Sequence, residues 1–254
     1  MPRQLIGIDV GGSSIKAGLV DLDAGRLVGD LKSAPTPKPS TPSAMLAVFQ
    51  ELVGRFPGSQ GKVGIAMPSV VKHGKVCTAA NIDHGWIGVH GPTLVEKPLG
   101  RQVIFLNDAD AAGVAEVKWG AGKGIKGTAI MLTFGTGIGT AFFVDGILLP
   151  NSELGHMQLP RHGEAEKWTS AHVRTAEKLD WPAWIERVNE YLARMHALFW
   201  PDLFILGGAV SERFDDFAPL LRSPARICAA AFAGQAGVIG AAMAAAEAAH
   251  RGPG

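Results

Sequence analysis

Two stretches of this 254-residue chain repeat one pattern, in which a strand, a glycine-rich turn and a second strand follow one another. The pattern occurs in LIGIDVGGSSIKAGLV, residues 5–20, and again in TAIMLTFGTGIGTAFFV, residues 128–144. A turn with so few side chains exposes backbone N–H groups, which suit a bound anion. The repeat therefore predicts an α/β protein with two similar halves, each of which places such a turn toward one anion.

The spacing of apolar residues predicts the other strands and helices. Buried strands are expected at residues 62–68, 102–107 and 202–210. Helices are expected at residues 43–56, 108–120, 164–174 and 182–200. The first of these helices has a clear start, because Thr41 can cap it and Pro42 suits its first turn.

A boundary between two lobes is expected near Asn107, where a buried strand gives way to a helix. This divides the chain into a small N-terminal lobe at residues 1–106 and a large C-terminal lobe at residues 107–237. The alanine-rich helix at residues 238–254 is expected to pack back on the first lobe. The predicted fold class is thus α/β, with two lobes around a central cleft.

The composition argues against several classes of protein. Lys and Arg number 24 against 23 Asp and Glu, which disfavours a generic nucleic-acid binder. The two cysteines, Cys77 and Cys228, exclude a disulfide framework and a cysteine-rich zinc site, and they fit a reducing cytosol. The sequence contains neither a visible signal peptide nor an apolar run that could span a bilayer. A cytoplasmic protein without nucleic-acid or membrane partners is expected, and we expect it to be a homodimer.

The first glycine turn has the parts of a phosphate and metal site. Its candidate phosphate ligands are backbone amides, hydroxyls and one ammonium group: Gly11, Gly12, Ser13, Ser14 and Lys16. Asp9, at the end of the preceding strand, can hold Mg²⁺ through water. An ordinary hairpin explains this turn equally well when it is taken alone, and the P-loop spacing is missing.

Two further glycine turns follow strands. The second offers Thr133, Gly135, Thr136 and Gly137 as phosphate ligands. The third, LGGAVS, brings Gly208 to the end of a strand, where it can pass near a nucleotide or simply allow close packing of a helix. A tight hairpin is the alternative interpretation of the second turn.

Asp108 is the candidate general base. It follows Asn107 at the junction of a buried strand and a helix, where the helix dipole favours an ionised carboxylate. An ionised carboxylate can accept a hydroxyl proton. The alternative is that Asp108 only caps the helix, and Asp110 is the better candidate for a structural role.

Three polar side chains are candidates for binding a sugar. Glu153 and His156 lie three residues apart in ELGH, so both can face one polar ligand. A turn or half of a zinc site would also explain them, but the segment directly after them has no cysteine and zinc is not expected. Asn81 lies in the polar loop AANIDHGW, which suits sugar recognition or a plain turn.

Lysines are concentrated in VKWGAGKGIKG, residues 117–127. Lys118, Lys123 and Lys126 can form an electropositive track for a long anion. A solvated basic loop is the simpler interpretation.

These motifs together resemble those of the ROK sugar kinases, a family of the actin-like ATPase superfamily. DVGGSSIK, the ND of LNDAD, LTFGTGIGTAFFVDG, ELGH and LGGAVS occur in that family's order, and the resemblance covers nearly the whole chain. It implies the actin-like (ribonuclease H-like) fold, with two lobes that close over a hexose and a phosphoryl donor. It also implies that Asp108 is the base and that Asp9 and the glycine turns handle Mg²⁺ and phosphate. Asn107, Glu153 and His156 would contact sugar hydroxyls.

One segment departs from the family pattern. Typical members follow the G-H motif with a cysteine-rich zinc loop, whereas this chain has MQLPRHGEAEKWTSAHVR, residues 157–174. The family's further sugar-binding glutamate is therefore assigned to Glu166, with Glu164 as the competitor. The short, zinc-free form with AANIDHGW and VKWGAGKG resembles the polyphosphate glucokinase branch, including its polyphosphate/ATP-glucomannokinase members.

The expected function is phosphorylation of the 6-hydroxyl of glucose, with inorganic polyphosphate or ATP as the donor. An ATP-dependent kinase for mannose, fructose or N-acetylmannosamine is the alternative within the family. An actin-like ATPase without a sugar substrate is the alternative from another class. A sugar-responsive repressor is not expected, because the first strand begins at residue 4 and leaves no room for an added DNA-binding domain.

Overall fold

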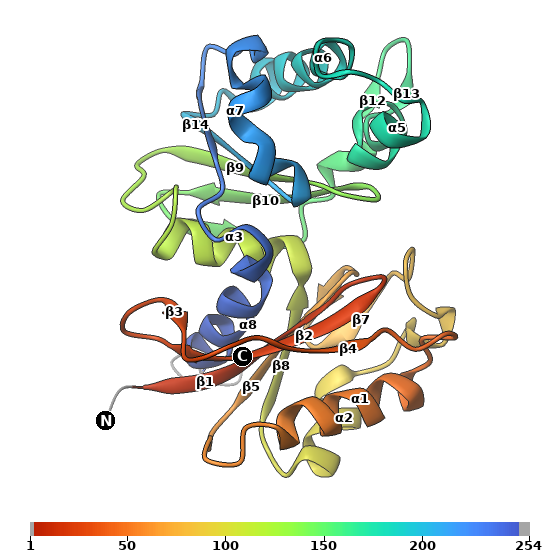
Figure 1. Cartoon of the computed structure of the whole chain (residues 1–254), viewed down its shortest axis with the longest axis vertical. Helices are drawn as coiled ribbons and strands as arrows, with labels where there is room; N and C mark the ends of the chain where they lie inside the picture. Colours follow the sequence, from red (N-terminus) through yellow and green to blue (C-terminus); the bar gives the residue numbers. More distant parts are fainter. Residues whose placement is uncertain (1–2, 249–254) are drawn as a thin grey trace. The chain divides into compact units, whose positions relative to one another are not determined.

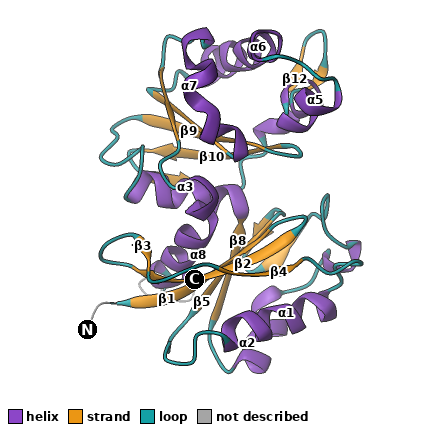
Figure 2. Ribbon diagram, viewed as in Figure 1, coloured by secondary structure: helices purple, strands orange, loops and turns teal. Residues whose placement is uncertain are grey.

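The structure is a computed structural model that describes residues 3–248, and its chain path is drawn in Figure 1 and its secondary structure in Figure 2. The chain forms two compact units. The first comprises the described residues up to Ala115 and those from Gln235 onward, and the second is the continuous segment Glu116–Gly234. Within the described residues, no helix is both long and apolar enough to cross a membrane.

The first unit is built on a six-stranded sheet in the order β3-β2-β1-β5-β8, with β4 paired to β2. Its strands are β1 (Gln4–Val10), β2 (Ser14–Asp21), β3 (Arg26–Leu27), β4 (Lys32–Pro35), β5 (Val63–Met67) and β8 (Val103–Asn107). The strands β6 (Val71–Lys72) and β7 (Lys75–Val76) form a separate hairpin. Its helices are α1 (Pro42–Gly54), α2 (Gly91–Leu99), α8 (Ala236–Glu247), the first turns of α3 (Asp108–Lys118) and the 3₁₀ turn η1 (His84–Trp86).

The two faces of this sheet are covered by different helices. Alternate residues of β1, including Ile6 and Ile8, pack in one apolar core with Phe49 of α1. Because side chains alternate along a strand, Gly7 faces the opposite side, where α8 lies. A Cβ on Gly7 would come within 1.9 Å of the carbonyl oxygen of Val238, so glycine is what allows α8 to lie directly on the sheet.

Replacing Gly64 with alanine is expected to destabilise the protein by about 3 kcal/mol, because the added Cβ would lie 1.8 Å from the backbone oxygen of Ala241 in α8. Gly54→Ala is the matched control, since no atom lies within 4 Å of the Cβ it adds near the end of α1. Chemical denaturation measures both free energies of unfolding. Equal stability of the two variants would contradict the close packing of α8.

The division between the units differs from the predicted one. The structure keeps the start of α3 in the first unit, where Ala111 contacts α8 so closely that a Cβ on Gly240 would lie 1.6 Å from its backbone oxygen. The division therefore falls after Ala115 rather than near Asn107, because the helix begins inside the first unit's packing. The part of the predicted helix 238–254 at residues 249–254 lies outside the described residues; residues 238–247 belong to α8, and Ala248 caps its end.

The second unit contains a five-stranded sheet in the order β11-β10-β9-β14-β15. Its strands are β9 (Thr128–Phe134), β10 (Ile138–Val144), β11 (Ile147–Leu149), β14 (Leu203–Gly207) and β15 (Arg226–Ala229), with a separate hairpin of β12 (Gln158–Leu159) and β13 (Gly163–Glu164). Its helices are α4 (Glu166–Thr169), α5 (Ala171–Ala176), α6 (Trp181–Phe199) and α7 (Phe214–Phe217). Short 3₁₀ turns complete it: η2 (Leu154–His156), η3 (Ala209–Arg213), η4 (Ala218–Leu220) and η5 (Ala233–Gln235, which ends at the division).

The internal repeat predicted from the sequence is present in the structure. In each unit an antiparallel pair joined by a glycine turn, β1–β2 or β9–β10, lies beside a parallel neighbour, β5 or β14. The helix predicted at residues 164–174 is wrong as one element. It breaks into α4 and α5 at Ser170, whose hydroxyl accepts a hydrogen bond from the N–H of Val173 and so begins a new helix.

Candidate functional site

The first glycine turn is closed by its own backbone and braced by a distant threonine. The N–H of Gly11 donates to the carbonyl of Ser14 at 3.0 Å. The buried Thr36 donates its hydroxyl to Gly11 O at 2.6 Å and its N–H to Ser13 O at 3.1 Å. Gly12 and Ser13 are exposed at the tip. The turn is therefore held firmly from behind while its tip faces solvent, as an anion site requires.

Asp9 lies in β1 directly before this turn, opposite Lys16 of β2. Its carboxylate packs against the bare Cα of Gly237 in α8, where a Cβ would lie 2.6 Å from Asp9 Cγ. Burial raises the pKa of Asp9 to about 6, and the charge of Lys16 opposes part of this rise. A further cation beside the carboxylate would favour its ionised form, so this position fits the Mg²⁺ predicted from the sequence.

Asn107 and Asp108 occupy the junction of β8 and α3. The buried Asn107 side chain donates to Ser69 O at 3.2 Å and accepts from the N–H of Asp110 at 3.0 Å, so Asn107 caps the helix. Asp108 Oδ1 accepts from the N–H of Ala109 at 2.8 Å, and the residue is half-buried. The capping role that the sequence left open for Asp108 is thus performed by its neighbour.

Asn81 is exposed on the loop between β7 and η1. The loop is ordered by its neighbours rather than by this residue. Asp83 Oδ1 accepts from the N–H of Gly85 at 2.7 Å, and the buried indole of Trp86 donates to Ser40 O at 3.0 Å. The carboxamide of Asn81 therefore lies on a fixed loop with its face open to solvent.

The second glycine turn joins β9 to β10. The N–H of Gly135 donates to Gly137 O at 3.0 Å, and Gly135 and Thr136 are exposed. Gly208, at a φ of 82°, lies behind the turn, where a Cβ would come 2.3 Å from the carbonyl oxygen of Phe134. The structure therefore brings Gly208 against the second turn, and close packing explains its need for glycine.

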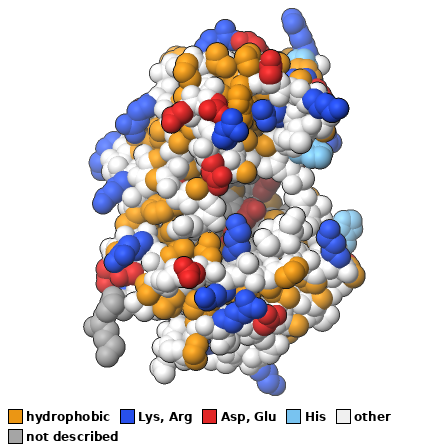
Figure 3. All heavy atoms as spheres, in the orientation of Figure 1, with side chains coloured by type: hydrophobic (Ala, Val, Ile, Leu, Met, Phe, Trp, Pro, Cys, Tyr) orange, Lys and Arg blue, Asp and Glu red, His pale blue; other side chains and the backbone are white. Residues whose placement is uncertain are grey.

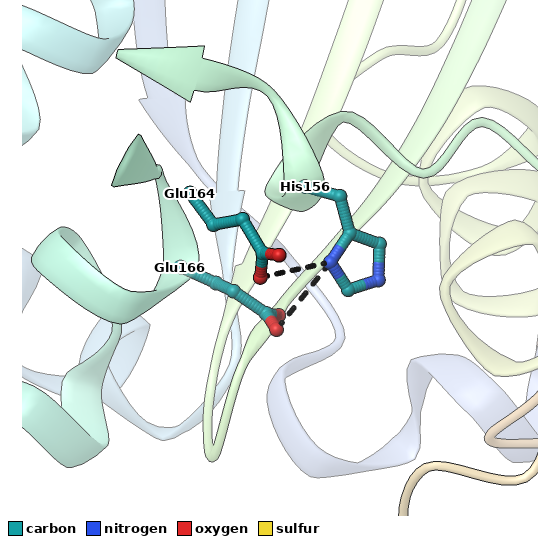
Figure 4. A group of neighbouring side chains, drawn as sticks. All are labelled: His156, Glu164 and Glu166. Carbon is teal, nitrogen blue, oxygen red and sulfur yellow. Dashed lines mark ion pairs between the residues drawn. The ribbon is translucent and has the colours of Figure 1, made fainter. Parts of the chain in front are cut away.

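Three glutamate side chains of the second unit surround the imidazole ring of His156. His156 Nδ1 lies 3.6 Å from a carboxylate oxygen of Glu164 and 3.6 Å from one of Glu166, and Nε2 lies 3.8 Å from Glu153. Figure 4 shows Glu164 and Glu166 side by side, facing the ring. The other oxygen of Glu166 accepts from the N–H of Ile138 at 3.3 Å, at the end of the second glycine turn. We call these four residues (Glu153, His156, Glu164 and Glu166) the acidic cluster.

The pKa values of two glutamates in the acidic cluster are shifted in opposite directions. Burial raises the pKa of Glu153, and the nearby Glu166 raises it further against the opposing charge of His156. A hydrogen bond from Lys167 lowers the pKa of Glu164, and their side chains lie 3.1 Å apart. An ionised carboxylate such as that of Glu164 accepts hydrogen bonds from neutral hydroxyls readily, because it carries several acceptor sites. The family resemblance assigned the sugar-binding role to Glu166, with Glu164 as the competitor. The structure brings both carboxylates to the ring of His156.

The acidic cluster is also compatible with a cation. One ligand atom from each of His156, Glu164 and Glu166 lies within 4.8 Å of the others. Imidazole and carboxylate ligands suit several divalent metals. The expected absence of zinc thus stays a prediction.

The basic stretch runs from the end of α3 along the connection to β9, and Lys118, Lys123 and Lys126 are exposed. Figure 3 shows Lys and Arg side chains interspersed with Asp and Glu over the face it presents, in keeping with the balanced composition. The exposure of these three lysines is compatible with the local track predicted for a long anion.

Several residues that shape the site were missed in the sequence. Thr36 lies in a proline-rich stretch, and Gly237 lies in an alanine-rich one. Glu116 is fully buried and accepts from the N–H groups of Ala121, Ala231 and Phe232 at 2.8–3.0 Å. A lone Glu in a helix gives no local signal of such a role; only the glycine at 120, whose Cβ would lie 2.2 Å from that carboxylate, hints at a close approach.

Comparisons with known proteins extend this description. The ROK family model matches residues 5–167. A polyphosphate glucokinase of Mycobacterium tuberculosis is 46% identical over 245 residues, which cover 95% of this chain and 91% of that protein. The crystal structure of an inorganic polyphosphate/ATP-glucomannokinase from Arthrobacter sp. strain KM superposes with a TM-score of 0.92 at 41% identity, covering 96% of this chain and 99% of that one.

A ROK family glucokinase from Streptomyces griseus, solved in complex with glucose and AMPPNP, superposes with a TM-score of 0.83 at 25% identity. The superposition covers 96% of this chain and 100% of that one. These similarities confirm the predicted α/β, actin-like fold class and the family resemblance.

Proposed function

Since the chain belongs to the ROK family, we propose that it is a glucokinase that transfers a phosphoryl group from inorganic polyphosphate to the 6-hydroxyl of glucose. The observation that carries this proposal is the 46% identity to a polyphosphate glucokinase along nearly the full length of both chains. The similarity to a polyphosphate/ATP-glucomannokinase supports ATP as a second donor and mannose as a second acceptor.

In this proposal the first unit supplies the base and one phosphate site. Asp108 accepts the proton of the 6-hydroxyl as its oxygen attacks phosphorus, which breaks the bond to the departing phosphate chain. Gly11, Gly12, Ser13, Ser14 and Lys16 hold phosphate oxygens. Mg²⁺, when bound near Asp9, neutralises phosphate charge. The raised pKa of Asp9 and the exposed turn tip support these roles.

The second unit, together with two side chains of the first, orients the substrates in this proposal. Glu153, His156 and Glu166 bind sugar hydroxyls, with Asn81 and Asn107 as further contacts. The second glycine turn holds phosphate through Thr133, Gly135, Thr136 and Gly137, with Gly208 supporting it. The hydrogen bond of Glu166 to the N–H of Ile138 supports a link between the sugar ligands and this turn. Positioning of this kind accounts for much of the rate in phosphoryl transfer.

A coupled assay of several hexoses against polyphosphate and ATP tests the function. Glucose with polyphosphate is expected to give the highest kcat/KM. If the main activity were instead with mannose, fructose or N-acetylmannosamine, and only with ATP as the donor, the chain would be an ATP-dependent kinase for that sugar. If ATP hydrolysis proceeded equally without any sugar, the chain would be an actin-like ATPase instead.

Use of polyphosphate is expected to weaken more steeply with added salt than use of ATP, because several lysines contact the longer anion. Replacing Lys123 and Lys126 with glutamine is expected to raise the KM for polyphosphate by about two- to fivefold per lysine. The control is the same change at the exposed Lys72 and Lys75 of the β6–β7 hairpin. Equal salt sensitivity for both donors would contradict the lysine track.

We further propose that the enzyme acts in the cytoplasm as a homodimer and needs no zinc. Both cysteines, Cys77 and Cys228, are free, in keeping with a reducing compartment. Light scattering on the purified protein measures the oligomeric state, and metal analysis of the active enzyme measures zinc.

A further inference from the structure

Trp168 of the second unit is held between two other side chains. The imidazole of His162 stacks on its indole with ring centroids 4.0 Å apart and planes inclined by 3°. The guanidinium carbon of Arg187 lies 3.7 Å from the indole centroid. Two groups this close to one centroid cannot share a face, so they cover opposite faces. We call His162, Trp168 and Arg187 the tryptophan stack.

Two members of the tryptophan stack flank, along the chain, the two glutamates that face His156. His162 directly precedes β13, which ends at Glu164, and Trp168 lies in α4, which begins at Glu166. The stack therefore clamps the chain on both sides of the two carboxylates. No other ring contact or cation–π contact of the described residues involves His162 or Arg187.

Helix α6 donates hydrogen bonds to the backbone at the end of α4, next to the ring of Trp168. Arg187 donates to the carbonyl of Trp168 at 3.2 Å in addition to covering its ring. The indole of Trp184, one turn earlier in α6, donates to the carbonyl of Thr169 at 3.0 Å. The end of α4 is thus tied to a 19-residue helix that packs in the core of the second unit.

Acidic partners hold the outer members of the stack. Glu177 pairs with Arg187 at 2.5 Å, and Glu190 lies 3.3 Å from Nε2 of His162. The indole N–H of Trp168 itself has no acceptor among the described residues. The orientation of this ring is therefore set by packing, on its two faces and against the core of the second unit, rather than by a hydrogen bond of its own.

We propose that the tryptophan stack is a positioning device for the sugar site, an inference that rests on the proposed function. His162, Trp168 and Arg187 touch neither sugar nor phosphate; they fix where Glu164 and Glu166 lie relative to His156. The β12–β13 hairpin and the buried Ala165 already order this segment, and the stack adds contacts on both sides of the two carboxylates, which a hydrogen bond requires to be held within a few tenths of an ångström. The stack thereby determines how tightly glucose binds.

Trp168→Leu is expected to raise the KM for glucose about tenfold, because small displacements of positioning groups weaken several hydrogen bonds at once. The KM for polyphosphate should change less than the KM for glucose. Trp181→Leu is the matched control: it removes a tryptophan that Arg174 covers at 3.7 Å in the same unit, but on a different segment. The control should lower the melting temperature comparably without the rise in the KM for glucose.

Two smaller changes test the stack if Trp168→Leu fails to fold. His162→Ala removes one face at a partly exposed residue and should also raise the KM for glucose. His162→Phe keeps a stacked ring and should restore a nearly normal value. If the Phe variant is as impaired as the Ala variant, stacking is not what matters and the proposal is overturned.

A double-mutant cycle separates this proposal from the function on which it rests. Glu166→Gln should raise the KM for glucose by itself, and adding His162→Ala should raise it by less than the product of the single effects. Fully multiplicative effects, or a normal KM for glucose in Trp168→Leu beside an impaired Glu166→Gln, would overturn the stack alone. A wild-type enzyme that does not phosphorylate glucose would overturn the proposed function as well.

Discussion

Replacing Asp108 with asparagine is expected to lower kcat for glucose phosphorylation by about 10²- to 10⁴-fold, the usual effect of removing a general base. Asparagine has nearly the same shape but cannot accept a proton from the attacking hydroxyl. The fold should persist, since the capping of α3 depends on Asn107 rather than on Asp108. The KM for glucose should change little, because the carboxylate acts on the proton in transit.

Asp110→Asn is the matched control for this experiment. Asp110 lies in the same first turn of α3, so both changes remove one negative charge near the same helix terminus. Asp110 is 2% exposed, and its loss is expected to reduce stability more than kcat. Steady-state kinetics, glucose calorimetry and thermal unfolding distinguish the two variants. Turnover of Asp108→Asn within about tenfold of wild type would remove it from the role of base.

Asp9→Asn is expected to make the metal-free enzyme more stable and much less active. The buried Asp9 carboxyl has its pKa raised from 3.8 to about 6, so between these values the folded protein holds a proton that the unfolded chain has released. The free energy of unfolding therefore falls as pH rises through this window, and the full loss persists above pH 6. A shift of this size corresponds to about 3 kcal/mol, which asparagine would recover at pH 8 but not at pH 4.

The loss of activity follows from the same carboxylate. Without its charge we expect Mg²⁺ to be held less tightly and kcat/KM for polyphosphate to fall by about 10²-fold or more at saturating glucose. Mg²⁺ should stabilise the wild type at pH 8 and have a smaller effect on Asp9→Asn. Asp23→Asn, at an exposed residue of the β2–β3 turn, is the control and should change neither property. An unchanged metal requirement in Asp9→Asn would contradict its role.

The elements that were predictable from the sequence are those with a local cause. The helix from Pro42 was expected because Thr41 caps it, and the structure confirms that Thr41 accepts from the N–H of Ala44. The paired glycine turns were visible because each lies between apolar runs. By contrast, α2 was missed, because Pro92 and Pro98 mask its helical pattern although the first lies in its opening turn.

Contacts between distant parts of the chain could not be predicted. Thr36 reaches Gly11 across 25 positions, and Gly237 accommodates Asp9 across more than 200. The spacing of residues within one element does not indicate which residues of distant elements will be in contact. The sequence could not decide which of Glu164 and Glu166 binds the sugar, because contacts between distant residues determine the position of both. A two-stranded hairpin and the stack on Trp168 bring both carboxylates to His156.

The first unit is made of two separate parts of the chain, so it cannot be completed until the whole second unit has been synthesised. Helix α8, which is synthesised after the whole second unit, covers the bare strand positions Gly7 and Gly64 and packs against Asp9. The second unit is one continuous stretch and has all its parts once residue 234 has emerged. Until α8 is made, one face of the first unit's sheet lacks its covering helix, and surface exposed in this way favours aggregation during synthesis.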